Sequence, residues 1–144
     1  MPTEAPTAAA EVLLLEQNAE EVALIKQAAE KNKVTVVVEC VDILSYLRRE
    51  GGYQNAPRPD LVILDLDLSR TQDCETLTEI KKHPSFKRIP VVVLASSKAY
   101  DDVLQAYDLR ANAYINKPAG TEDFVRIMRA TLHFWLTMVR LPRD

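Results

Sequence analysis

The chain has 144 residues, of which 47% are apolar, so it is long enough to bury one core of ordinary domain size. Its formal charge of −3 and the lack of any apolar stretch near the roughly 18 residues of a membrane span argue against nucleic-acid binding and against membrane insertion. Its two cysteines, Cys40 and Cys74, lack the spacing of a zinc site or of a disulfide framework, which favours reduced thiols in a cytoplasmic protein.

Short apolar runs, each rich in Val, Ile or Leu, recur along the chain after a Pro-, Thr- and Ala-rich start. We expect residues 1–10 to form a disordered tail, because they lack the basic start and apolar core of a signal peptide, and residues 11–144 to form one domain. Such runs are typical of strands that are covered on both faces. The predicted strands are residues 12–15, 34–38, 61–64 and 89–95, with a weaker candidate at 113–115.

Amphipathic stretches separate these runs. Apolar residues recur there at helical spacing: Val22, Ile25 and Ala29; Ile43, Leu44 and Leu47; Leu77 and Ile80; Val103, Ala106 and Tyr107. A strand followed by a helix, repeated five times, predicts an α/β fold with a doubly wound parallel sheet and helices on both faces. Ligands bind such sheets at the carboxyl ends of the strands, so the chemistry is expected directly after each apolar run.

Charged side chains stand at three of these strand ends. Glu16 follows the first run, Asp65 and Asp67 follow the third, and Lys117 follows the fifth. Carboxylates gathered at one edge of a sheet create a negative pocket that attracts Mg²⁺ or an ammonium group. A carboxylate such as Asp65 can also attack phosphorus to form an aspartyl phosphate.

Two other interpretations of these residues remain open at this point. Any one acid at a strand end is commonly a helix cap or a solvated turn residue. The pattern Asp65-Leu66-Asp67 also resembles the signature of haloacid dehalogenase-type phosphatases, in which the first acid is the nucleophile and the second a general acid. That reading leaves Glu16 without a role and lacks both an acid pair beyond Lys117 and room for a substrate cap.

Four segments together resemble the receiver domains of bacterial response regulators, the CheY-like family. They are residues 13–18 (LLLEQN), 59–68 (PDLVILDLDL), 89–97 (IPVVVLASS) and 113–118 (AYINKP), and the resemblance extends from about residue 11 to 142. It implies a flavodoxin-like sheet with strand order 2-1-3-4-5. It also implies a non-enzymatic signalling protein that accepts a phosphoryl group from a sensor histidine kinase and acts through protein contacts.

The resemblance also assigns roles to individual residues. Asp65 matches the phosphoacceptor. Glu16, Asp65 and the main-chain carbonyl of Asp67 match the groups that hold Mg²⁺. Lys117 matches the lysine that pairs with the acceptor.

Three further positions follow from the same resemblance. Tyr114 matches an aromatic switch residue, and Ala95 stands at the switch position where the family has Thr or Ser. Pro118 follows a peptide bond that is often cis in the family, an isomer that proline makes less costly.

Two residues depart from the family pattern. Gln17 stands in place of the second acid of the pair, and a neutral amide should bind Mg²⁺ more weakly, or not at all. The methyl group of Ala95 cannot hold a phosphoryl oxygen as a hydroxyl does. These departures keep a second function open, a degenerate receiver that works as a phosphate-independent interaction or dimerisation module.

The loop at residues 51–60 and the tail at 134–142 resemble the single-domain regulators of bacterial and cyanobacterial phytochromes, so a phytochrome is a candidate partner and no output domain is expected. The last helix is predicted to begin at Thr121 and to extend to about Leu141, before Pro142. Its apolar arc is wider than packing on one sheet requires. We therefore expect a homodimer or partner face that includes Phe124, Met128, Trp135 and Met138.

Overall fold

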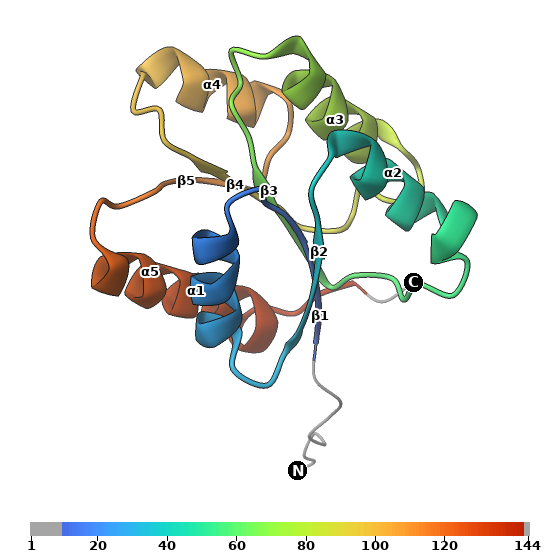
Figure 1. Cartoon of the computed structure of the whole chain (residues 1–144). Coiled ribbons are helices and arrows are strands. Elements are labelled where there is room, and N and C mark those ends of the chain that lie inside the picture. Colours follow the sequence, from blue (N-terminus) through green and yellow to red (C-terminus); the bar gives the residue numbers. More distant parts are fainter. Residues whose placement is uncertain (1–9, 143–144) are drawn as a thin grey trace.

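A computed structural model, which describes residues 10–142, contains one sheet of five parallel strands (Figure 1). The strands are β1 (Glu11–Leu15), β2 (Lys33–Val37), β3 (Leu61–Asp65), β4 (Val91–Ala95) and β5 (Ala113–Asn116). Their order in the sheet is β2-β1-β3-β4-β5, which confirms the predicted topology.

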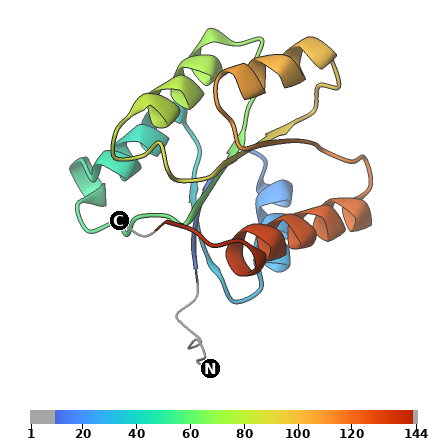
Figure 2. The same ribbon diagram turned by 180° about the vertical axis from the view of Figure 1, so that it is seen from behind.

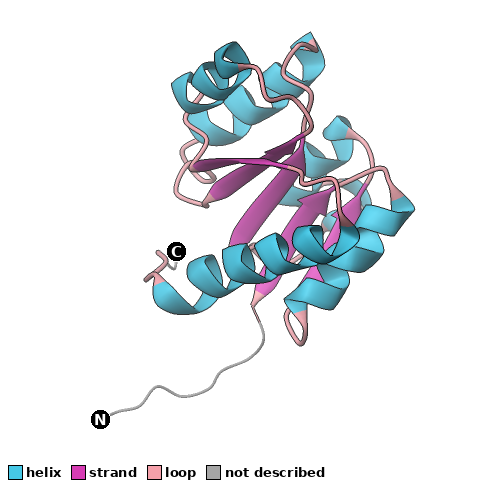
Figure 3. Cartoon of the chain, turned by 90° about the vertical axis from the view of Figure 1, so that its left-hand side faces the viewer, coloured by secondary structure: helices cyan, strands magenta, loops and turns pink. Residues whose placement is uncertain are grey.

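Helices cover both faces of this sheet, as Figures 1 and 2 show from opposite sides. They are α1 (Ala19–Ala29), α2 (Cys40–Arg48), α3 (Thr71–Lys82), α4 (Tyr100–Asp108) and α5 (Thr121–His133), with a short 3₁₀ turn, η1, at Gly51–Tyr53. One face carries α1 and α5, and the other carries α2, α3 and α4. The sheet therefore forms the middle layer of three, which is clearest from the side (Figure 3).

The central strands are apolar except at their ends because both of their faces are covered. Along β3, Val62 and Leu64 belong to the core under α2, α3 and α4, whereas Leu61 and Ile63 belong to the core under α1 and α5. All four side chains are fully buried. Each such side chain contributes about 1.5–3 kcal/mol of transfer free energy, so β3 is a rigid base for whatever follows it.

The register of the strands brings their carboxyl ends to one edge. Leu15 pairs with Leu64, Asp65 with Leu94, and Ala95 with Asn116. From β1 the chain passes to β2 on one side, and β3 lies on the other side, so the crevice between β1 and β3 is the topological switch point.

The end of the chain differs from the predicted long helix. The α-helix stops at His133 and continues as a π-helical turn, η2 (Phe134–Met138), in which the Val139 amide donates to the Phe134 carbonyl at 3.1 Å. The Thr137 hydroxyl donates to the His133 carbonyl at 2.6 Å, a back-bond that competes with the regular ladder. The prediction of a helix to about Leu141 is therefore wrong.

The predicted partner face is also partly wrong. Phe124 and Met128 are 4% and 0% exposed, since they pack in the core beneath α1 and α5. Trp135 packs at the edge of the same core, and only Met138, at 67% exposure, is available to a partner. A wide apolar arc on a helix can result from deep burial as well as from a surface for a partner, and here two of the four predicted residues, Phe124 and Met128, are buried.

The predicted tail lies almost entirely outside the described residues. Ala10 is the exception, because its amide donates to the Asn32 side chain and its carbonyl accepts from Lys33. Among residues 10–142, no helix combines the length and the apolar character that crossing a bilayer requires.

Candidate functional site

An open pocket lies at the carboxyl edge of the sheet, over the ends of β1, β3 and β4. Its wall includes most of the predicted site residues: Glu16, Gln17, Asp65, Asp67, Ala95 and Tyr114. Lys117 reaches the same place by contacting Asp65. The structure therefore brings an acid from β1, an acid from β3 and an amine from β5 together, as the sequence predicts.

Asp65 and Lys117 form the central ion pair of this pocket. The Lys117 ammonium donates to Oδ2 of Asp65 at 2.5 Å and to Oε1 of Glu21 at 2.7 Å. Burial alone would lower the pKa of Lys117, but the bonds to Asp65 and Glu21 outweigh it and leave the pKa raised. The Lys117 main-chain amide also donates to the Ala95 carbonyl at 3.0 Å, which holds the lysine against the end of β4.

Glu16 is buried at 2% exposure beside Asp65. Its Oε2 accepts the Asn18 amide at 3.1 Å, whereas its Oε1 is buried without a hydrogen-bond partner among the described residues. Burial and the neighbouring Asp65 carboxylate raise the pKa of Glu16 to about 8. The site therefore disfavours a Glu16 carboxylate that carries its charge without a compensating cation.

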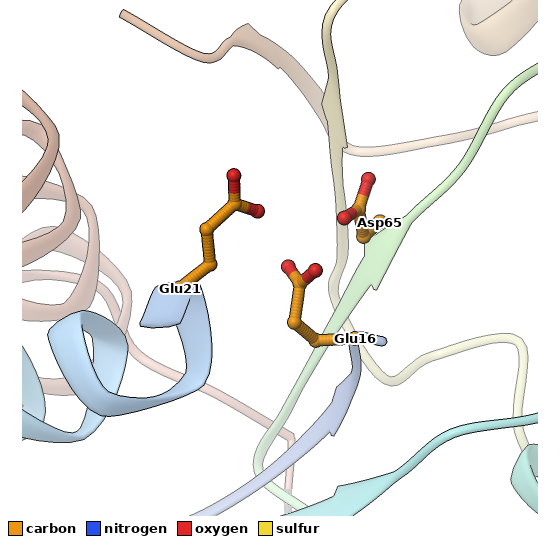
Figure 4. A group of neighbouring side chains, drawn as sticks. All are labelled: Glu16, Glu21 and Asp65. Carbon is orange, nitrogen blue, oxygen red and sulfur yellow. The ribbon is translucent and has the colours of Figure 1, made fainter. Parts of the chain in front are cut away.

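Carboxylate oxygens of Glu16, Glu21 and Asp65 all lie within 4.8 Å of one another, and the three side chains point toward one another (Figure 4). Carboxylate oxygens are the ligands that Mg²⁺ prefers. The unpartnered, buried oxygen of Glu16 is the atom that a cation would satisfy, so these residues fit a divalent metal ion.

Asp67 faces solvent, and its carboxylate belongs to a local turn. It accepts the Ser69 amide at 3.0 Å and the Ser69 hydroxyl at 2.7 Å, bonds that lower the pKa of Asp67. Its main-chain amide donates to Oδ2 of the buried Asp73 at 2.8 Å. The backbone at position 67 is thus held by Asp73 while its side chain is occupied elsewhere.

Gln17 lies in the pocket wall but does not join the acid oxygens. Its side chain is exposed, and the amide donates to the Val38 carbonyl beyond β2 at 3.3 Å.

The two switch positions lie on neighbouring strands. The Tyr114 hydroxyl donates to the Ser97 carbonyl at 2.7 Å, and the side-chain amide of Asn116 donates to the same carbonyl. Ala95 is buried and offers no hydroxyl. The Ser97 hydroxyl donates to Asp102 at 2.5 Å, which fixes the start of α4.

The peptide bond before Pro118 corrects one expectation. No cis peptide bond occurs between residues 10 and 142, so the Lys117–Pro118 bond is trans. The trans isomer is the lower-energy form even before proline, by about 0.5–1 kcal/mol.

Glu21 is the site residue that sequence reasoning missed. It lies in the first turn of α1, whose N-cap is Asn18. The spacing Asn18-x-x-Glu21 indicates a capping box, in which the glutamate would accept the N-cap amide. In the structure Glu16 accepts that amide instead, so the Glu21 carboxylate is left for Lys117.

Comparison with known proteins agrees with this geometry. Residues 12–129 match the response regulator receiver domain. The chain is 36% identical over 119 residues to response regulator Rcp1 of Synechocystis sp., which covers 83% of this chain and 81% of Rcp1. The crystal structure of the phosphorylated cyanobacterial phytochrome response regulator RcpA matches with a TM-score of 0.87 at 40% identity, over 94% of this chain and 100% of that one. The Mn²⁺-bound form of Rcp1 matches with a TM-score of 0.86 at 33% identity, over 93% and 99%.

Proposed function

The chain belongs to the response regulator receiver domain family of two-component signalling, and from this we propose that Asp65 is the residue that accepts the phosphoryl group. The donor is a phosphohistidine of a sensor kinase. An Asp65 oxygen attacks the phosphorus, a P–O bond forms, the P–N bond breaks, and the imidazole leaves with the electron pair.

The neighbouring side chains support this transfer. Lys117 already pairs with Asp65 and would pair with the oxygens of an aspartyl phosphate. Glu16, Asp65 and the main-chain carbonyl of Asp67 are the groups proposed to hold a divalent metal ion, with Mg²⁺ as the physiological candidate. Such an ion supplies positive charge to the transferred oxygens when it is bound.

One observation carries the proposal: the Asp65 side chain, 22% exposed on a rigid strand, meets Lys117 and the buried Glu16 in one pocket. The test is to incubate the full chain with a small phosphodonor and Mg²⁺ and to measure the intact mass. We expect one added phosphoryl group in the wild type and in Asp67→Asn, and none in Asp65→Asn. Asp67→Asn is the matched control, because it removes an acid from the same pocket wall that is bound to Ser69.

The buried methyl group of Ala95 favours a second candidate function, a receiver that signals without phosphate. No adduct at any Mg²⁺ concentration would support that function and remove the first. Under both candidates the protein is a signalling module rather than an enzyme. Steady release of phosphate from an ester would instead support a phosphatase that uses Asp65 and Asp67.

The relatives support a proposal for the partner. RcpA is a cyanobacterial phytochrome response regulator, so the proposed kinase partner is of the phytochrome type. The proposed location is the cytoplasm, and no nucleic-acid ligand is proposed. Transfer of phosphate from an autophosphorylated phytochrome kinase to the wild type, but not to Asp65→Asn, is the expected result.

We also propose that the chain forms a homodimer through the π-helical turn. Phe134 and Met138 are 44% and 67% exposed on this turn, beside Trp135. Two apolar side chains exposed next to each other are a feature that self-association would cover.

A further inference from the structure

Glu21 presents a carboxylate that α1 does not need. The amides of Glu20 and Glu21 both donate to the Asn18 side chain, and the Asn18 amide donates to Glu16. These bonds satisfy the start of the helix without the Glu21 carboxylate. That carboxylate is half-buried, at 26% exposure, and turns toward Asp65 and Glu16 (Figure 4).

Position 17 cannot supply this charge. Gln17 is neutral, and its amide is bonded to the Val38 carbonyl. Among the described residues, the carboxylates that gather around Asp65 are therefore those of Glu16 and Glu21.

A second observation indicates that the cluster is built for a cation. Oε1 of Glu16 is buried without a partner, and a buried oxygen left unsatisfied costs about 1–3 kcal/mol. Each of the three residues has an oxygen within 4.8 Å of the others, whereas adjacent ligands of an octahedral Mg²⁺ ion lie about 3 Å apart and opposite ligands about 4 Å apart. The half-buried side chains of Asp65 and Glu21 would have to rotate toward each other, and the Lys117 ammonium away, for all three residues to bind one ion.

We propose that Glu21 is a direct ligand of the divalent cation and supplies the carboxylate that position 17 lacks. Lys117 holds the Glu21 carboxylate in place, because its ammonium is bonded to both Glu21 and Asp65. This inference rests on the proposed function insofar as it assumes a cation beside Asp65, but it does not require that Asp65 be phosphorylated.

The test is calorimetric titration of the full chain with Mn²⁺ alone. Loss of a residue that only supports a metal ligand typically weakens binding by about 10- to 100-fold, so loss of the charge of a direct ligand in Glu21→Gln should weaken it by at least about tenfold. Glu20→Gln is the matched control, since Glu20 lies in the same turn, is exposed and is outside the cluster, and its affinity should stay within about twofold of the wild type. Adding Gln17→Asp to Glu21→Gln should restore part of the loss.

The Mn²⁺ affinities of these variants test the role of Glu21 and the cation site separately. Equal affinities of the wild type and Glu21→Gln, or equal losses in Glu20→Gln and Glu21→Gln, would overturn the role of Glu21. Absence of Mn²⁺ binding by the wild type would overturn the cation site as a whole. The phosphoryl adduct on Asp65 is measured in a separate experiment. If the adduct forms and Glu21→Gln binds Mn²⁺ as tightly as the wild type, the role of Glu21 is wrong and the proposed function still stands. Urea unfolding of each variant verifies that the chain is folded.

Discussion

At the scale of single residues, the pocket balances three carboxylates against one ammonium group. Glu16 is the acid that burial makes most costly to ionise, and Asp65 and Glu21 share Lys117. Three ionised carboxylates and one ammonium group carry a net charge of −2, which a proton or a cation at Glu16 would reduce.

The two cysteines also respond to neighbouring charge. Burial raises the pKa of the Cys40 thiol, and the Asp73 carboxylate, 3.6 Å from its sulfur, raises it further. Burial likewise raises the pKa of Cys74, with Asp73 contributing. Both thiols are therefore poor nucleophiles near neutral pH and gain reactivity only as the pH rises above the ordinary thiol range.

Asp73→Asn removes a negative charge that disfavours the thiolate, so it should lower the pKa of Cys40. We expect alkylation of Cys40 by iodoacetamide at about pH 8 to become severalfold faster than in the wild type, as measured by peptide mass spectrometry. Asp101→Asn, on the exposed side of α4, should leave the rate unchanged. An unaltered rate in Asp73→Asn would show that Asp73 does not control this thiol.

At the scale of elements, the start of α1 is tied to the pocket by its cap. Asn18→Ala removes the side chain that accepts two helix amides, at 2.9 and 3.1 Å, and should cost about 1 kcal/mol of the free energy of unfolding. Urea denaturation measures this loss. Asn55→Ala, an exposed loop position, should stay within about 0.5 kcal/mol, and an equal loss there would argue against a capping role.

Two methionines of the C-terminal segment test the division between core and surface. Met128 is fully buried and Met138 is 67% exposed. Met128→Ala should cost about 2–5 kcal/mol because it leaves a cavity, whereas Met138→Ala should change the stability of the monomer by less than about 0.5 kcal/mol. Similar losses in chemical denaturation would contradict the burial of α5 described above.

The elements are also where sequence reasoning works best. Each predicted strand lies within about two residues of the observed one, because the buried part of a covered strand is an apolar run that polar residues bound. The apolar pattern predicted the last helix but not the residue at which it ends. The α-helix ends where the Thr137 hydroxyl competes with main-chain amides for the His133 carbonyl, and an apolar pattern carries no information on that competition. Glu21 could not be assigned for a similar reason: whether it caps α1 or meets Lys117 depends on a residue from β1 that takes the cap amide first.

At the scale of the whole molecule, the homodimer is the property that the exposed π-helical turn predicts. Sedimentation equilibrium of the wild type should give the mass of a dimer. Met138→Glu should give a monomer, because a charge would be buried at the contact. Val41→Glu is the control, since Val41 is an exposed apolar residue on α2 and its replacement should leave the dimer intact. A monomeric wild type, or a dimeric Met138→Glu, would refute this interface.

The five helices are not held equally firmly. In α4 only Ala106 is buried, while Tyr100, Leu104 and Tyr107 face solvent. Its first turn is held by the Ser97 hydroxyl, which donates to Asp102, and the Ser97 carbonyl accepts from Tyr114 and Asn116 of β5. The free energy of local opening should therefore be lower for α4 than for α1 or α3, and its amides should exchange with deuterium sooner. A change at the carboxyl edge of the sheet that breaks the bond between Ser97 and Asp102 should therefore speed deuterium exchange in α4 before it does so in α1 or α3.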